Sequence, residues 1–518
     1  MAMAVDGRWY ALGDAARFMK LEGIEYREYQ FNIINAVRRH GNTMVVLPTG
    51  LGKTIIGAGI IATALAGRRK ALFLAPTKPL AEQHYNTMHK LLDLGEGELL
   101  LLTGSLGKAK RKDLHTVSKV VVATPQTVAN DLKGGVFSLD GYGAVIFDEC
   151  HRAVGKYAYT YIANECTVRG ILMAGLTASP GSKAEKINAI ARTLDIRHIE
   201  MRVSTDPDVV KYVMPNNVHI VSVELSQRIN EMARLLRPEI DACLDGLHRL
   251  GLFHFRNFDN IPKGRLIELG NQIGRLTSSN YKFAAMFNYS KLLNLAHAYD
   301  LLVVEGIYPF HTYIESLYTR QDKSRSLESL LKSPKMVAAR AAASTAVRNG
   351  EEHPKIVALL DVIKNYKDRH MIVFAQYRST IKMIVEFLNN NGFSARAFVG
   401  KKEGVTQEQQ KKTIEDFRNG LFSVLVASSI GEEGIDIPGV DLVLFYEAIP
   451  NEIRNIQRRG RTGRFAEGEV YILIANGTKD QVYLFISRQR ETKMLSAIRS
   501  INRALDARSS TAYGQQRL

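Results

Sequence analysis

Three short segments of this 518-residue chain contain the residue types that handle a nucleoside triphosphate. Residues 47–54 read LPTGLGKT, residues 148–151 read DECH, and residues 457–464 read QRRGRTGR. Phosphoryl transfer needs backbone N–H groups that hold phosphates, carboxylates that hold a metal ion and orient water, and positive charge on the γ-phosphate. Because the arginine-rich segment lies far along the chain from the other two, we expect one ATP site built by two separate domains.

The segment LPTGLGKT predicts a phosphate-binding loop, because residues 44–48 read as a strand and the residues after Thr54 read as a helix. In this context the loop amides and the helix N-terminus face the phosphates. We expect Lys53 to contact the β- and γ-phosphates and Thr54 to hold Mg²⁺ through its hydroxyl. The strict pattern GxxxxGK[ST] would place a glycine where Leu47 stands. Nucleotide contacts are expected along the whole loop: Leu47, Pro48, Thr49, Gly50, Leu51, Gly52, Lys53 and Thr54.

The segment AVIFDECH places Asp148 and Glu149 at the end of an apolar run that predicts a buried strand. Burying two carboxylates at the end of such a strand is unfavourable in free energy unless they bind a metal ion. We expect Asp148 to hold Mg²⁺ and Glu149 to orient and deprotonate the attacking water. Without the phosphate loop, the same pair would be read as a helix-capping pattern.

The segment QRRGRTGR is too rich in arginine for a core segment. Arg461 and Arg464 are three residues apart, so on a helical turn they can point the same way towards a γ-phosphate. The alternative interpretation is a solvated basic helix that binds nucleic acid.

These motifs must be positioned by strands, and the chain offers two sets of them. Short apolar runs bounded by Gly and Pro predict buried parallel strands of an α/β sheet, whose ligands bind at the carboxyl ends. The first set lies at 44–48, 70–76, 119–125 and 144–149, and the second set lies at 370–377, 394–400, 423–428 and 441–447.

Between the two sets, from about residue 215 to residue 350, the pattern becomes helical. Apolar residues recur at helical spacing: Ile229, Met232, Leu236, Ile240, Leu244 and Leu247. We predict a first α/β domain over 1–214, a helical insert over 215–350, and a second α/β domain over 351–518. Within these limits, the polar run 321–333 is expected to be a loop and residues 481–506 an arginine-rich amphipathic helix.

Composition indicates the partner and the compartment. The formal net charge is +17 and the isoelectric point is about 9.6, which favours a polyanionic partner such as nucleic acid. Three cysteines without a CxxC pair argue against a disulfide framework or a zinc site and favour a reducing compartment. We see no secretory leader and no apolar run long enough to span a membrane. We therefore expect a cytoplasmic, nucleoid-associated protein.

Further segments resemble, in order, the motifs of superfamily 2 helicases. They are REYQ (27–30), APTKPL (75–80), TGS (103–105), TPQT (124–127), LTASPG (176–181), VFAQYR (373–378) and SSIGEEGIDIP (428–438). Within that superfamily the residues of these motifs are most similar to those of the family of archaeal Hef, the Fanconi anaemia group M translocase and the Mph helicases. The resemblance covers nearly the whole chain, including HAYDLLVVEGIYPFHTYIESLY in the helical segment.

The resemblance implies two RecA-like parallel-sheet domains with an inserted helical, thumb-like domain that favours branched DNA. It also implies an ATP-dependent DNA helicase or translocase of replication-fork repair and recombination, with a separate nuclease or a sliding clamp as protein partners. At the ATP site the resemblance implies that Arg27 and Gln30 contact adenine and that Gly434 and Asp436 contact the nucleotide from the second domain. It implies a link between His151 and Gln457, and arginine fingers at Arg461 and Arg464. Thr177 and Ser179 are implied to couple hydrolysis to domain motion. The implied path of one nucleic-acid strand is Thr77, Lys78, Gly104, Thr124, Gln126, Arg378 and Ser428.

The chain departs from the family pattern in two places, and other interpretations remain open. Cys150 stands where the family usually has alanine, as it does in the helicases of Dicer and the double-stranded RNA sensors, so an RNA-dependent ATPase is the main alternative. An inactive nucleic-acid scaffold is a weaker alternative, since Lys53, Asp148 and Glu149 are intact. Nothing after Asp480 resembles the XPF-type nuclease of many archaeal relatives, so we expect no DNA cleavage by this chain.

Overall fold

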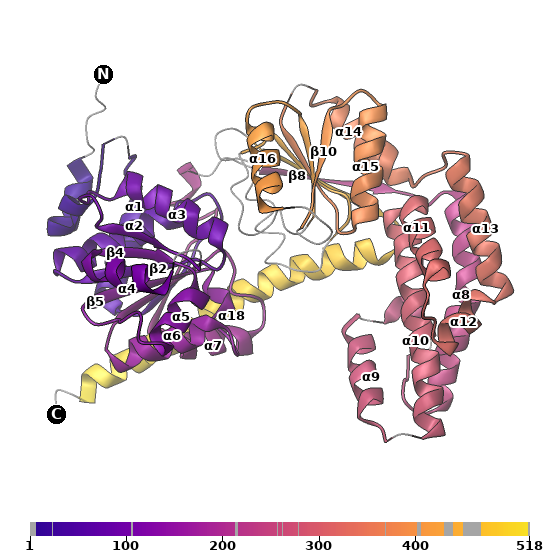
Figure 1. Cartoon of the computed structure of the whole chain (residues 1–518), viewed down its shortest axis with the longest axis horizontal. Helices are drawn as coiled ribbons and strands as arrows, with labels where there is room; N and C mark the ends of the chain where they lie inside the picture. Colours follow the sequence, from indigo (N-terminus) through magenta and orange to yellow (C-terminus); the bar gives the residue numbers. More distant parts are fainter. Residues whose placement is uncertain are drawn as a thin grey trace.

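Two parallel β-sheets and a helical insert make up the structure, a computed structural model (Figure 1). It describes residues 7–22, 24–104, 107–212, 216–255, 257–261, 263–277, 279–367, 369–400, 406–428, 439–448 and 468–515. The predicted fold class, two RecA-like parallel-sheet domains with an all-helical insertion, is confirmed. Within these residues no helix is both long and apolar enough to cross a bilayer.

The first unit is a seven-stranded parallel sheet in the order β3-β4-β2-β5-β6-β1-β7. Its strands are β1 (Thr43–Val46), β2 (Lys70–Leu74), β3 (Leu99–Leu102), β4 (Val120–Ala123), β5 (Tyr142–Asp148), β6 (Leu172–Thr177) and β7 (His198–Met201). The four strands predicted for this region are confirmed as β1, β2, β4 and β5. Strand β6 lies between β5 and β1, so the segments that follow these three strands emerge side by side.

Helices cover both faces of this sheet. They are α1 (Glu28–His40), α2 (Lys53–Ala66), α3 (Lys78–Leu91), α4 (Lys108–Val117), α5 (Pro125–Lys133), α6 (Ala158–Val168) and α7 (Ala184–Thr193), with the 3-10 segments η1 (Gly7–Phe18), η2 (Cys150–Arg152) and η3 (Val210–Tyr212). Successive strand residues point to opposite faces. Phe73 therefore packs with α1, α2 and α3, and Leu72 packs with α5, α6 and α7. Burial on both faces explains why the strands read as continuous apolar runs.

The second unit is a six-stranded parallel sheet in the order β10-β11-β9-β12-β13-β8. The strands are β8 (Asn216–Val223), β9 (Met371–Phe374), β10 (Ala395–Phe398), β11 (Val424–Ala427), β12 (Leu442–Phe445) and β13 (Gly468–Ala475), with helices α14 (Pro354–Lys364), α15 (Arg378–Asn390) and α16 (Gln407–Arg418). The predicted strands of this region are confirmed as β9, β10, β11 and β12. The insert was predicted to start at residue 215, but in the structure it starts after β8. Residues 216–223 form β8, which pairs with β13 from Asn216↔Gly468 to Val223↔Ala475 and so belongs to the second sheet.

The helical insert follows β8 and leads back to α14. Its helices are α8 (Gln227–Arg249), α9 (Lys263–Arg275), α10 (Asn280–Asp300), α11 (Ile307–Thr319), α12 (Arg325–Leu331) and α13 (Pro334–Arg348), with η4 (Phe258–Asn260) and the π-turn η5 (Leu301–Glu305). The apolar stripe predicted on α8 is buried in a separate core. The prediction of a loop over 321–333 is wrong in part: Ser324 caps α12 by accepting the Leu327 N–H, and Leu327 and Leu330 enter the same core.

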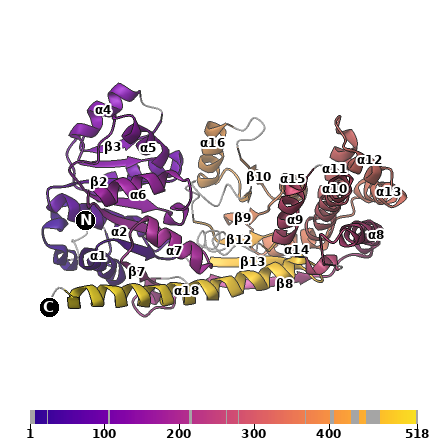
Figure 2. The same cartoon turned by 90° about the horizontal axis from the view of Figure 1, so that it is seen from below.

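The C-terminal helix α18 (Lys479–Gln515) begins in the second unit and runs to the first (Figures 1 and 2). It was predicted as part of the second domain, but Met494, Ile498 and Ile501 are buried in the core of the first unit beside α7. The Asn502 Oδ1 atom accepts a hydrogen bond of 2.7 Å from the Ile199 N–H at β7. The helix therefore ties the two units together.

Candidate active site

The phosphate loop joins β1 to α2, as predicted from its sequence. Gly52 adopts a left-handed conformation (φ 76°) at the N-terminus of α2, and a side chain there would collide with the Gln30 amide. The Lys53 ammonium donates to the carbonyls of Leu47 at 2.9 Å and Pro48 at 3.3 Å, so it lies inside the loop. Thr54, the next residue of α2, is half-buried. The loop thus presents a cation and a helix N-terminus together, which is the arrangement that binds polyphosphates.

Of the two residues predicted to meet adenine, Gln30 contacts this loop. The Gln30 amide donates to the Leu51 carbonyl at 3.2 Å, and the Tyr29 hydroxyl donates to the same carbonyl at 2.8 Å. The Gln30 Oε1 atom is buried without a hydrogen-bond partner among the described residues. Arg27 pairs with Glu25 at 3.0 Å and stacks over the Tyr212 ring. A buried unpaired acceptor at Gln30 fits an amino-group donor such as that of adenine.

The acidic pair occupies the end of β5. Asp148 is buried, and its Oδ2 atom lies 2.9 Å from His84 Nε2 on α3. The Tyr159 hydroxyl donates to the Asp148 carbonyl at 2.6 Å. Burial alone would raise the pKa of Asp148, but His84 and Lys53 outweigh it, so this pKa lies below its ordinary value. An ionised carboxylate near the loop lysine is the form that can bind a cation.

Glu149 begins a short chain of contacts towards the next strand. It is a non-glycine residue in the left-handed region (φ 49°), and its Oε2 atom lies 3.2 Å from His151 Nδ1. The same nitrogen lies 3.2 Å from the hydroxyl of Thr177 at the end of β6. A left-handed backbone at a residue other than glycine is uncommon, and such strain concentrates at functional sites.

The predicted coupling residues Thr177 and Ser179 contact each other, and Ser179 also contacts the C-terminal helix α18. The Thr177 hydroxyl accepts from the Ser179 N–H and donates to the Ser179 carbonyl, each at 3.1 Å. The Ser179 hydroxyl lies 2.9 Å from the sulfur of Met494 on α18. Thus the segment that touches His151 also touches the helix that arrives from the second unit. That helix contact could not be predicted from the motif alone.

The donor set suits Mg²⁺. Thr54 and Asp148 offer hard oxygen ligands beside a phosphate-binding loop, and Mg²⁺ is typically held by one or two protein oxygens together with phosphates and water. Among the described residues there is no group of three or more His, Cys, Asp or Glu that could hold a metal ion by itself. The residues therefore fit a metal ion that arrives with its nucleotide.

The residues predicted to line a nucleic-acid path lie at equivalent edges of the two sheets. In the first unit Thr77, Gly104 and Thr124 follow the neighbouring strands β2, β3 and β4. In the second unit Arg378 and Ser428 follow the neighbouring strands β9 and β11. Each set thus lies at the carboxyl edge of adjacent parallel strands.

Individual side chains on this path have local partners. Thr77 caps α3 through the Leu80 N–H, and the Thr124 hydroxyl bonds that of Thr127 at 2.9 Å. Arg378 donates to the Gly400 carbonyl at 3.1 Å. Lys78 and Gln126 are exposed, whereas the Ser428 side chain is buried. Nearby, Lys411 of α16 pairs with Glu82 of α3 at 2.7 Å, which joins the two units.

Five predicted site residues lie outside the described part of the chain. They are Gly434, Asp436, Gln457, Arg461 and Arg464. Their roles remain predictions. Three residues that sequence reasoning missed are His84, Tyr159 and Met494. For His84 a signal was present, because helical spacing places it with Ala81 and Met88 on the buried face of α3.

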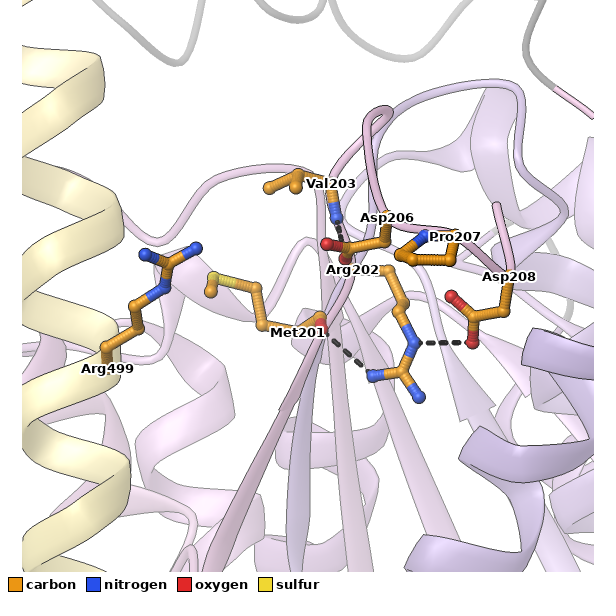
Figure 3. A pocket seen from close by; sticks show the side chains of 7 residues that line it. All are labelled: Met201, Arg202, Val203, Asp206, Pro207, Asp208 and Arg499. Carbon is orange, nitrogen blue, oxygen red and sulfur yellow. Dashed lines mark hydrogen bonds and ion pairs between the residues drawn. The ribbon is translucent and has the colours of Figure 1, made fainter. Parts of the chain in front are cut away.

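A separate cavity of about 380 Å³ lies between the loop after β7 and α18 (Figure 3). Its lining residues are Met201, Arg202, Val203, Asp206, Pro207, Asp208 and Arg499. Arg202 pairs with Asp208 at 2.9 Å, and Asp206 accepts from the Val203 N–H at 2.7 Å. Because Arg202, Asp206 and Asp208 already have partners within the protein and no lining residue belongs to the motifs, we assign no ligand to this cavity.

Comparison with known proteins agrees with this geometry. Residues 23–182 match the family model described as type III restriction enzyme, res subunit, and residues 354–466 match the helicase conserved C-terminal domain. The crystal structure of the Pyrococcus furiosus Hef helicase domain has 39% sequence identity and a TM-score of 0.70, covering 89% of this chain and 98% of that one.

Curated relatives are longer than this chain. A Methanocaldococcus jannaschii protein, provisionally described as an ATP-dependent RNA helicase, is 36% identical, with 95% of this chain and 63% of that protein covered. The Neurospora crassa ATP-dependent DNA helicase mph1 is 32% identical over 88% of this chain and 41% of its own length. The Schizosaccharomyces pombe ATP-dependent DNA helicase fml1 is 28% identical over 88% of this chain and 58% of its own length. The loop, acidic pair and paired sheets described above, together with these matches, show that the chain belongs to the superfamily 2 helicases, in the family of the Hef helicase domain.

Proposed function

We propose that this protein hydrolyses ATP to move along or unwind DNA, and that forked or branched DNA is its substrate. The observation that carries the proposal is the spatial order of the site. The phosphate loop, the buried Asp148 and the half-buried Glu149 stand at one end of the first sheet, and the edges of both sheets carry the predicted strand path. The names of the mph1 and fml1 relatives support DNA as the substrate.

In this proposal each residue of the loop region has a chemical task. Lys53 and the N-terminus of α2 hold the phosphates, and Gln30 reads adenine through its buried amide. Thr54 and Asp148 would hold Mg²⁺, which neutralises charge on the phosphates during transfer. Glu149 takes the proton of the attacking water, and an arginine of the segment 457–464 completes the site from the second unit.

One feature of the structure supports coupling of hydrolysis to movement. The chain from Glu149 through His151 and Thr177 to Ser179 ends on Met494 of α18, a helix rooted in the second unit. A change at the γ-phosphate that moves Glu149 can therefore reach the second unit through packed groups. Relative motion of two units that each hold one strand would advance that strand.

The surface of the insert supports recognition of branched DNA. At the start of α10, Phe283, Met286 and Phe287 are exposed, with Phe283 at 66%. Lys282 and Lys291 belong to the same helix, and the Lys291 ammonium lies 5.8 Å from the Phe287 ring centroid. Aromatic faces beside cations bind unpaired bases without sequence preference. Such bases occur where a duplex divides, which favours a fork over a linear end. The proposed setting is the nucleoid, with a separate nuclease or a sliding clamp as partner.

The test is ATP turnover with forked DNA, single-stranded DNA and double-stranded RNA, at several salt concentrations because phosphate contacts are salt-dependent. We expect forked DNA to stimulate turnover most. Glu149→Gln should bind ATP and lose turnover, since an amide cannot accept the proton, and Lys53→Ala should weaken ATP binding itself. Stimulation by single-stranded DNA equal to that by forks would refute the branched substrate.

The alternative function is an RNA-dependent ATPase. The description of the Methanocaldococcus relative and the Cys150 of DECH favour it. In the same assay, double-stranded RNA as the strongest activator would replace the DNA proposal with this one.

A further inference from the structure

A histidine occupies a core position of α3 directly behind the acidic motif. Along α3 the buried residues are Ala81, His84, Met88 and Leu91, and His84 is 8% exposed. Its ring packs against Phe73 of β2, with 4.6 Å between ring centroids. An apolar side chain would satisfy this position by packing alone. A buried imidazole there needs a polar partner.

That partner is the Asp148 carboxylate. His84 Nε2 lies 2.9 Å from Asp148 Oδ2, whereas His84 Nδ1 is buried without a hydrogen-bond partner among the described residues. An ionised carboxylate only accepts hydrogen bonds, so Nε2 carries the proton and donates. The Nε2–H group of His84 thus points at the carboxylate of the residue that we expect to hold the metal ion.

Asp148 is held from two sides. The Tyr159 hydroxyl fixes its backbone carbonyl at 2.6 Å, and His84 fixes its side chain at 2.9 Å. A carboxylate can accept about four hydrogen bonds or metal contacts, so the His84 bond selects one orientation and leaves capacity for a cation. Groups that orient metal ligands in this way commonly change metal affinity when removed.

We propose that His84 is a positioning residue for the metal site, because its N–H holds the Asp148 carboxylate in the orientation that meets Mg²⁺ beside the phosphate loop. This inference rests on the proposed role of Asp148 as a metal ligand. It also gives α3 a place in the site. The helix begins at Thr77 and Lys78 on the predicted strand path, and Glu82 on the same helix pairs with Lys411 of the second unit. One helix therefore joins the strand path, the second unit and the metal ligand.

The experiment uses the full chain and three substitutions of His84. His84→Leu removes the donor, His84→Asn keeps an amide that is too short to reach Asp148, and His84→Gln places an amide N–H at nearly the reach of Nε2. The probe is Mn²⁺ with a non-hydrolysable ATP analogue, and bound Mn²⁺ is measured by electron paramagnetic resonance. His89→Leu is the matched control, since His89 is exposed on the same helix. Thermal melting establishes that each variant is folded.

We expect His84→Leu and His84→Asn to raise the Mn²⁺ concentration for half-saturation by about 10-fold or more. His84→Gln should recover most of the loss, His89→Leu should match the unaltered protein, and affinity for the analogue in EDTA should be unchanged. If His84→Leu does not fold, the comparison of Asn with Gln decides. Normal Mn²⁺ binding by the Asn or Leu variant overturns the inference, and so does a Gln variant as weak as Asn.

A parallel measurement on Asp148→Asn separates this inference from the proposed function. Weakened Mn²⁺ binding by Asp148→Asn, together with normal binding by His84→Asn, overturns only the role of His84. Normal Mn²⁺ binding by Asp148→Asn overturns the metal role of Asp148 and the inference with it.

Discussion

Lys355 and Asp480 form a buried ion pair where the insert, the second sheet and α18 meet. Their side chains are 0% and 1% exposed. The Lys355 ammonium also donates to the Val304 carbonyl of the π-turn at 3.0 Å. The Asp480 carboxylate also accepts from the N–H groups of Ala448 at 3.2 Å and Ala475 at 3.1 Å. Four separate segments therefore depend on one pair of charges.

Asp480→Ala should be among the most destabilising single changes in the second unit. It leaves the Lys355 ammonium buried without its carboxylate, and breaking such a pair from one side costs about 3–5 kcal/mol. Two backbone N–H groups also lose their acceptor, at about 1 kcal/mol or more each. We expect a total loss of about 5–7 kcal/mol, which corresponds to a fall of about 10–28 °C in the melting temperature of a unit of this size.

The assay is urea unfolding followed by circular dichroism, with hydrogen exchange of peptides from 301–305 and from the start of α18. The matched variant is Lys355→Met with Asp480→Asn, which removes both charges and keeps one side-chain oxygen, so that the N–H of either Ala448 or Ala475 retains its acceptor. It should recover most of the loss, since removing both partners of a buried pair is often nearly neutral. A loss below about 1 kcal/mol for Asp480→Ala, or a double variant no more stable than the single one, would refute the reasoning.

Three further predictions concern catalysis, pH and substrate choice. Arg461→Ala and Arg464→Ala should each cut nucleic-acid-stimulated turnover far more than ATP affinity, because a finger acts mainly in the transition state; intact turnover in either variant would remove that arginine from the site. Burial raises the pKa of Glu352 to about 7, so its neutral form stabilises the fold at low pH and this stability is lost as pH rises through 7. In urea unfolding, Glu352→Gln should therefore raise the free energy of unfolding by about 1–3 kcal/mol at pH 8 and by little at pH 5. Equal increases at the two pH values would contradict the raised pKa. Replacing residues 227–348 with a short linker, which spares β8, should keep ATP binding and abolish the preference for forks, so that the ratio of fork-stimulated to single-strand-stimulated turnover falls to about one. An unchanged ratio in a folded variant would place fork recognition elsewhere.

The sequence by itself determined the features that are local in the chain. The loop 47–54 needs only a strand before it and a helix after it, and the residues directly on either side of the loop predict both. Seven of the eight predicted strands are buried along nearly their whole length, and burial on both faces favours an apolar run; β10 is the exception, with Arg396 exposed. Periodicity gave the order of the domains, and the family resemblance then supplied the roles of residues that composition alone could not assign.

The tertiary structure decided which distant segments meet. Strand β8 is separated from its partner β13 by the whole insert, and as the edge strand of its sheet it lacks the long apolar run of a central strand. The destination of α18 was equally hidden, because an amphipathic pattern shows that a helix has a buried face but does not name the surface that covers it. The contacts of His84 with Asp148 and of Ser179 with Met494 follow the same rule. A side chain's chemistry is fixed by its type, but its partner is fixed only when the chain has folded.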